Sequence, residues 1–113
     1  MSLEEDVIVP MVDMKETDEA VIVIMDLPGV ERDEVDISIF DNTLRVVAKR
    51  NNEKESTERC YYTQERIYNR FERAIDLPVA IRADEARARL ENGILEITSP
   101  KEIVTTRKRI TIA

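Results

Sequence analysis

Alternating apolar and polar positions predict β-strands in the first half of the chain. In EVDISIF (34–40) the apolar Val35, Ile37 and Ile39 alternate with polar residues, which is typical of a half-buried strand. Asp41-Asn42 follows as a turn, and LRVVAK (44–49) resumes an extended pattern. These residues predict a hairpin.

Two segments depart from this alternation. AVIVIMDL (20–27) is a nearly continuous apolar run closed by Pro28-Gly29, which predicts a strand buried on both faces. In contrast, KRNNEKESTER (49–59) has no apolar residue and cannot enter a core, so it is expected to form a long solvated loop.

Alternation returns in CYYTQERIYNRFERAIDLP (60–78), but one charge falls on its apolar face. Ile67, Phe71, Ile75 and Leu77 share that face, and Arg73 lies among them. A charged group there is costly unless it is paired and hydrogen-bonded. We therefore predict a carboxylate or carbonyl partner for Arg73, from the same or another subunit; the alternative is that its guanidinium extends out from the sheet edge.

The segment AIRADEARARLENG (80–93) is compatible with two structures. Its Ala, Arg and Glu content suits a helix, and Asn92-Gly93 can end a helix or turn a hairpin. The hairpin alternative places apolar residues opposite apolar ones and opposite charges together, which favours strands with, at most, a short helical turn around 81–85. The predicted cross-strand pairs are Leu90 with Leu95, Ala88 with Ile97 and Arg89 with Glu96.

Seven or so short strands with turns between them and no long helix predict an all-β sandwich, whose last strand is closed by Pro100. The length of 113 residues and the hydrophobic content of 42% suit one domain with one core.

The charge of the chain limits its partners. A formal net charge of −7 disfavours nucleic acid and anionic membranes, which bind Lys and Arg. The chain has no apolar run near the roughly 20 residues that a membrane span needs, and it starts with an acidic segment rather than a secretory signal. A cytoplasmic location is therefore predicted by default. The single Cys60 cannot form an internal disulfide, which fits a reducing compartment without proving one.

The composition also argues against an enzyme. The chain has no His, which removes Ser-His and Cys-His nucleophiles and His-bearing metal sites. Its only glycines, Gly29 and Gly93, cannot build a phosphate-binding loop or a dinucleotide fingerprint. No catalytic residue, metal site or cofactor is therefore predicted.

The chain ends in RKRITIA (107–113), and this tail predicts a docking motif. Ile110 and Ile112 lie two residues apart, so in an extended strand they point the same way and can fill a groove. The three basic residues before them either steer the tail toward an acidic surface or keep a mobile end solvated.

Four of these pieces together resemble a known family. LPGV (27–30), FERAIDLP (71–78), ARLENGILEI (88–97) and the terminal Ile-Thr-Ile resemble the α-crystallin domain of small heat-shock proteins in its archaeal or bacterial form. The resemblance implies an immunoglobulin-like β-sandwich of about seven to nine short strands. It also implies a holdase that captures unfolding client proteins without ATP and assembles into homodimers and larger oligomers.

The resemblance further implies where the chain contacts its neighbours. Ile110 and Ile112 match the family's carboxy-terminal motif, which docks on a neighbouring dimer in a groove that would be lined here by Val35, Ile37, Ile39, Ala86, Ala88 and Leu90. The hairpin turn beside this groove would be Asn92-Gly93.

The dimer of the family forms when a strand after the long loop enters the sheet of the partner. The corresponding interface residues would be Tyr61, Tyr62, Thr63 and Glu65, together with Arg73, which matches the family's characteristic arginine. Cys60 would be a small hydrophobic residue near that strand, and a redox-sensing role is the alternative.

The expected organisation is a short amino-terminal arm at 1–10, an α-crystallin domain at 11–100 with the loop and swapped strand at about 49–66, and a carboxy-terminal extension at 101–113. Because the arm is short and has no aromatic residue, we expect it to be truncated; the alternative is a natural short form with weak client capture. A rival hypothesis is a monomeric CS-domain-like co-chaperone adaptor, which needs neither the polar loop nor the Ile-Thr-Ile tail.

Overall fold

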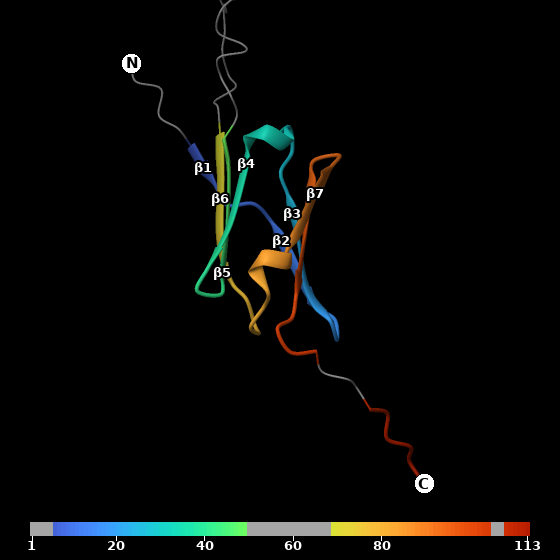
Figure 1. Cartoon of the computed structure of the whole chain (residues 1–113). Helices are drawn as coiled ribbons and strands as arrows, with labels where there is room; N and C mark the ends of the chain where they lie inside the picture. The colour runs from blue at the N-terminus through green and yellow to red at the C-terminus, as the bar shows by residue number, and fades with distance from the viewer. Residues whose placement is uncertain (1–5, 50–68, 105–107) are drawn as a thin grey trace, which may run out of the picture.

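Eight strands pack as two four-stranded sheets (Figure 1). The computed structural model describes residues 6–49, 69–104 and 108–113. The strand order in the first sheet is β1-β6-β5-β4 and in the second β2-β3-β8-β7. The first sheet contains β1 (Asp6–Ile8), β4 (Val35–Phe40), β5 (Thr43–Lys49) and β6 (Asn69–Asp76); the second contains β2 (Val12–Glu16), β3 (Ala20–Asp26), β7 (Arg87–Glu91) and β8 (Ile94–Pro100).

The β4–β5 hairpin forms where the sequence predicts it. Asp41 and Asn42 adopt positive φ angles of 50° and 62°, which a two-residue turn of this kind needs and which Asn and Asp tolerate better than most residues. The side chain of Asn42 holds the turn in place, because its Nδ2 donates to the carbonyl oxygens of Leu77 at 3.1 Å and Val79 at 2.9 Å. The turn is thereby tied to the chain that follows β6.

The second hairpin confirms the strand alternative for residues 87–97. Its register places Leu90 opposite Leu95, Ala88 opposite Ile97 and Arg89 opposite Glu96. The turn is Asn92-Gly93, with φ angles of 52° and 75°. The helical turn expected nearby is a 3₁₀ helix, η2 (Ala83–Glu85).

The core lies between the inner faces of the two sheets. It is built mainly from buried residues of β3, β5 and β8, which alternate with outward-facing neighbours. These residues are Val21, Val23, Met25, Leu44, Val46, Ala48, Leu95 and Ile97.

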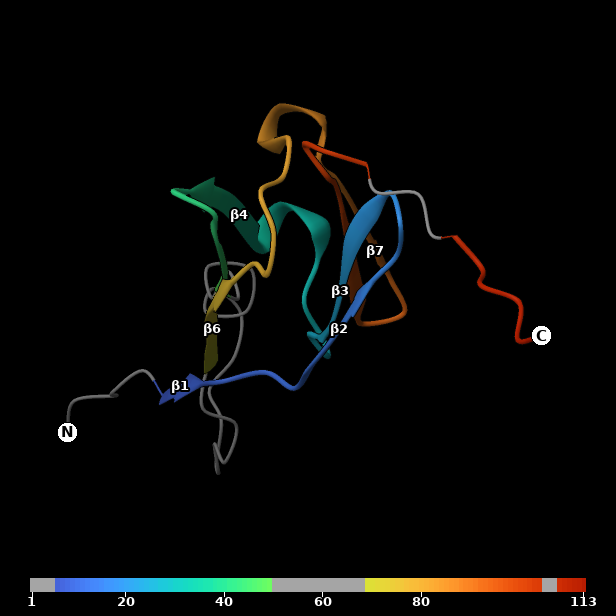
Figure 2. The same cartoon turned by 90° about the horizontal axis from the view of Figure 1, so that it is seen from below.

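The prediction that 20–27 is buried on both faces is wrong for one face. Ile22 and Ile24 alternate with the core residues of β3 and are half-buried, because they lie on the outer side of the second sheet. The described part of the chain places no second layer over that side, as the two-layer arrangement in Figure 2 shows. The β-branched composition of the run reflects strand formation rather than double burial.

The segment expected as an arm contributes a strand that the sequence did not indicate. β1 pairs in parallel with β6, with Ile8 opposite Phe71. The chain then crosses from the first sheet to β2 in the second, which Figure 2 shows clearly. Because β1 has three residues, it is too short to produce a readable alternation.

Candidate docking site

A groove lies between β4 and β7, which are each one of the two edge strands of their sheet. It contains a cavity of about 290 Å³, and edge strands expose backbone groups to which another extended segment can bind. Its larger apolar side chains are Val35, Ile37, Leu90 and Leu95, which also belong to the core or pack against it. The complete lining is Arg32, Val35, Ile37, Ala88, Arg89, Leu90 and Leu95.

The alternation of β4 creates one wall of this groove. Val35, Ile37 and Ile39 turn inward, but they are only half-buried because β4 is at the edge of its sheet. A 3₁₀ helix, η1 (Arg32–Glu34), precedes the strand, and the backbone N–H of Glu31 donates to Glu34 Oε1 at 2.9 Å across it. The backbone N–H of Glu34 donates in turn to the carbonyl oxygen of Glu31 at 3.0 Å, and these two hydrogen bonds fix the turn that brings Arg32 to the rim.

The structure brings most of the predicted groove residues together. Val35, Ile37, Ala88 and Leu90 line the cavity. Ile39 and Ala86 do not. Ile39 lies further along β4 and packs against the core, whereas Ala86 precedes β7 and its N–H donates to the carbonyl of Ala83 to close η2.

Three lining residues were missed from the sequence: Leu95, Arg89 and Arg32. Leu95 could have been predicted, since the predicted hairpin already placed it opposite Leu90. The position of Arg89 at the rim of the groove could not be predicted, because its side chain belongs to the outer face of the sheet, where it lies 3.8 Å from Glu96. Arg32 had no signal, because η1 carries no apolar periodicity.

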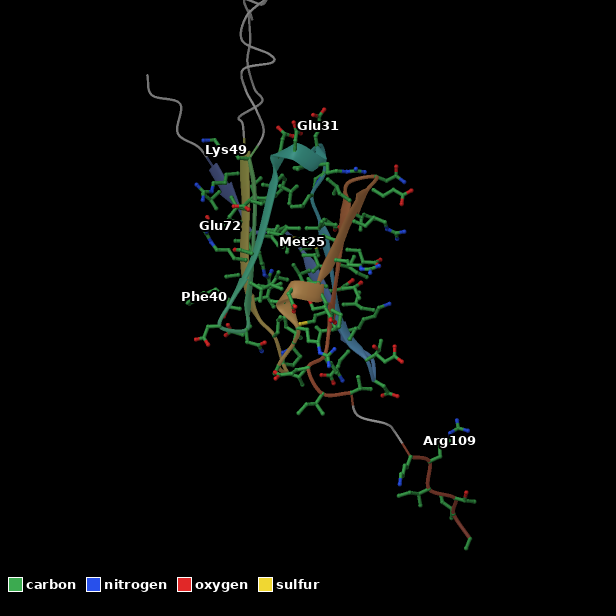
Figure 3. The ribbon with its side chains drawn as sticks, viewed as in Figure 1. Met25, Glu31, Phe40, Lys49, Glu72 and Arg109 are labelled. Carbon is green, nitrogen blue, oxygen red and sulfur yellow. The ribbon has the colours of Figure 1, made fainter. Side chains whose placement is uncertain are left out.

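The two tail isoleucines do not pack into the core of their own chain. Ile110 is 91% exposed and Ile112 is 94% exposed. The tail extends away from both sheets at the end opposite η1, where Figure 3 labels Arg109. Two large aliphatic side chains are thus exposed to solvent.

Arg73 has the kind of partner predicted for it. Its Nη1 donates to the carbonyl oxygen of Pro10 at 3.1 Å, and Pro10 is buried. The partner belongs to the same chain and to the segment that joins β1 to β2. A role of Arg73 between subunits stays a prediction, and Cys60, Tyr61, Tyr62, Thr63 and Glu65 lie outside the described residues.

The outer face of the first sheet carries a charged cluster around Glu72 (Figure 3). Arg45 Nη2 donates to Glu72 Oε1, and Arg70 Nε lies 3.5 Å from Oε2. The hydrogen bond from Arg45, with the charge of Arg70 beside it, lowers the pKa of Glu72. A carboxylate held ionised in this way is a poor proton donor, so the cluster is suited to cross-strand pairing rather than acid catalysis.

The described residues contain no group of three or more Asp, Glu, Cys or His side chains that could hold a metal ion. Within the same ranges, no helix has the length and apolar character needed to cross a membrane.

Comparisons with known proteins agree with this fold. Residues 13–113 match the Hsp20/alpha crystallin family. The chain is 37% identical to spore protein SP21 of Stigmatella aurantiaca over 105 residues, which are 93% of the chain and 62% of the relative. It is also 37% identical to small heat shock protein C2 of Rickettsia felis over 95 residues, 84% of the chain and 62% of the relative.

Solved structures give the same result. Heat shock protein 16.0 from Schizosaccharomyces pombe superposes with a TM-score of 0.72 at 32% identity, over 94% of this chain and 99% of that one. A small heat-shock protein from Xylella fastidiosa gives 0.66 at 31% identity, over 93% and 96%. The chain spans 62% of the length of the two curated relatives. By its matched residues and its fold, it belongs to the Hsp20/alpha crystallin family.

Proposed function

We propose that this chain is an ATP-independent holdase that assembles by inserting Ile110 and Ile112 into the β4–β7 groove of a neighbouring copy. The observation that carries the proposal is the cavity between β4 and β7, which is lined by aliphatic side chains and by two arginines, in a chain that also has two highly exposed isoleucines. The heat-shock names of the relatives support a chaperone role.

The alternation of the tail suits a groove between two edge strands. In an extended tail, Ile110 and Ile112 project from one side, and Thr111 projects from the other. The cavity is open to a segment of this kind because β4 and β7 are edge strands, so backbone hydrogen bonds can add to side-chain burial.

The energetics favour reversible assembly. Burying two Ile side chains contributes at most ~3–6 kcal/mol, whereas ordering the tail backbone costs ~1–2 kcal/mol for each residue fixed. One tail therefore binds weakly, and stable particles need several tails engaged together. Tails that exchange leave grooves accessible for part of the time.

An accessible groove also explains client capture. Its lining of Val35, Ile37, Leu90 and Leu95 suits an extended apolar segment of an unfolding protein as well as it suits the tail. Assembly and client binding then compete for one surface, with no need for nucleotide.

Deleting residues 107–113 tests the assembly step. Light scattering of the intact and shortened chains should show that the deletion reduces the particle to a small building block. Suppression of aggregation of a heated test protein without ATP checks the holdase step. An intact chain that is monomeric and leaves aggregation unaffected would favour the adaptor hypothesis.

A further inference from the structure

A buried lysine lies where the C-terminal extension leaves the body. Lys101 directly follows β8 and is only 9% exposed, which is unusual for a lysine. Its Nζ lies 3.6 Å from Glu16 Oε2 at the end of β2, and the Glu16 side chain is 43% exposed. The aliphatic stem of Lys101 is thus covered by the protein, and its charged end lies beside a carboxylate at the sheet margin.

The backbone around Lys101 is held from two sides. Its N–H donates to the carbonyl of Glu19, in the turn between β2 and β3, at 2.8 Å. On the other side, Lys101 forms an isolated bridge with Ile81, and the N–H of Glu102 donates to the carbonyl of Ala80 at 3.0 Å. Residues 101–102 are therefore fixed between two segments that are far apart in sequence.

The described residues that follow Glu102 are exposed. Ile103 is 77% exposed and Val104 is 57% exposed, and the described tail residues beyond them are exposed as well. Among the described residues of the extension, the backbone hydrogen bonds to the two sheets therefore end at Glu102. Ile110 is eight residues further on, a reach of at most about 29 Å for a fully extended chain.

We propose that Lys101 and Glu16 form a clamp that sets the exit direction of the tail and thereby selects which neighbouring groove Ile110 and Ile112 reach. This inference rests on the tail docking proposed above. With the clamp closed, a short tether leaves from one fixed point, and the effective concentration of the tail is high only for grooves in a narrow range of positions. An open clamp lengthens and frees the tether, so tails reach grooves in several arrangements.

The clamp also joins the tail root to β2, an edge strand of the second sheet. A change at that edge can move Glu16 and loosen Lys101. Lys101 is a positioning residue in this account, since it acts on the tail without contacting the groove.

The test compares Lys101→Met, Glu16→Gln and the double variant in the intact chain. Lys101→Met keeps the aliphatic stem and removes the charge, and Glu16→Gln changes a half-exposed side chain with little risk to folding. Lys15→Met is the matched control, because Lys15 is the exposed neighbour of Glu16 on β2. The readouts are amide hydrogen exchange at Lys101 and Glu102 and the spread of particle masses.

Each single variant should raise exchange at these two amides by about tenfold and broaden the mass distribution, with the control unchanged. The double variant should add little to either single one, because both remove the same ion pair. Unchanged exchange would overturn the clamp. Faster exchange with an unchanged mass distribution would equally overturn its role in directing the tail. Failure of docking itself appears separately, as an unchanged mass after deletion of 107–113.

Discussion

The guanidinium of Arg73 donates a hydrogen bond to the carbonyl oxygen of Pro10, which lies 63 residues earlier in the chain, at 3.1 Å. Pro10 sits between β1 and β2, where the chain crosses from one sheet to the other. The bond therefore fastens the crossing segment to β6.

Replacing Arg73 with Met should weaken this attachment. The substitution keeps an apolar side chain of similar length but leaves the carbonyl of the buried Pro10 without its donor, at a cost of about 1–3 kcal/mol. Urea unfolding measures the change. Arg87→Met, at an exposed position on β7, is the control and should change the free energy of unfolding by no more than about 0.5 kcal/mol. Equal effects of the two substitutions would contradict the assignment.

Substitutions at Asn42 should separate turn conformation from hydrogen bonding. Asn42→Ala loses two hydrogen bonds and places a β-carbon at a φ of 62°, so a loss of about 2–4 kcal/mol is expected. Asn42→Gly keeps the favoured conformation and loses only the bonds, so it should cost less, about 1–2 kcal/mol. Thermal or chemical unfolding of both variants checks which of them loses more stability. If the Gly variant is less stable than the Ala variant, the positive φ of residue 42 does not determine the stability of the turn.

The two hairpins could be predicted because their determinants are local. Asp41-Asn42 and Asn92-Gly93 supply the positive φ values that tight turns need, and alternation on both sides fixes the register. β1 could not be predicted, because its pairing with β6 joins segments more than 60 residues apart through three residues. Ile22 and Ile24 were misassigned for a related reason: an apolar run does not reveal which face receives a covering layer.

The candidate site, like the fold, could be predicted where its determinants are local in sequence. Alternation identified the inward residues of β4, and the hairpin register identified those of β7. The position of Arg32 depends on the cap of η1, which brings it near a strand distant in sequence. The pairing of Lys101 with Glu16 could not be predicted, because nothing in the sequence around Lys101 indicates that its side chain is covered.

The Glu72 cluster predicts a pH effect on stability. The pKa of Glu72 is lowered in the folded protein, chiefly by the hydrogen bond from Arg45. A lowered folded-state pKa means that the contribution to stability is fully present above the pKa of the unfolded chain and is lost as pH falls through the folded-state value. Glu72→Gln should therefore be less stable than the parent at neutral pH, and the difference should shrink in acid. Unfolding midpoints of the parent and of Glu72→Gln, measured from neutral pH into acid, check this trend. A stability difference between the two proteins that grows in acid would contradict it.

A substitution in the groove should block docking without unfolding the chain. Ala88 lines the cavity and is exposed, so Ala88→Gln places a larger polar side chain in the path of the tail. A smaller particle by size-exclusion chromatography with light scattering is expected, because each weakened tail contact lowers the avidity of the whole assembly. Arg87→Gln is the matched control, since Arg87 lies next to Ala88 but faces the outer side of the sheet. Equal masses for both variants and the parent would contradict a groove at this position.

The central claim is that Ile110 and Ile112 hold copies of the chain together. Sedimentation velocity of the parent, the variant Ile110→Ser/Ile112→Ser and the control Thr111→Ser tests it most directly, because the substitutions leave the buried core untouched. The account predicts that the double variant sediments as a small building block while the parent and control sediment as larger particles. If the double variant keeps the parent's mass, the tail does not drive assembly and the account is contradicted.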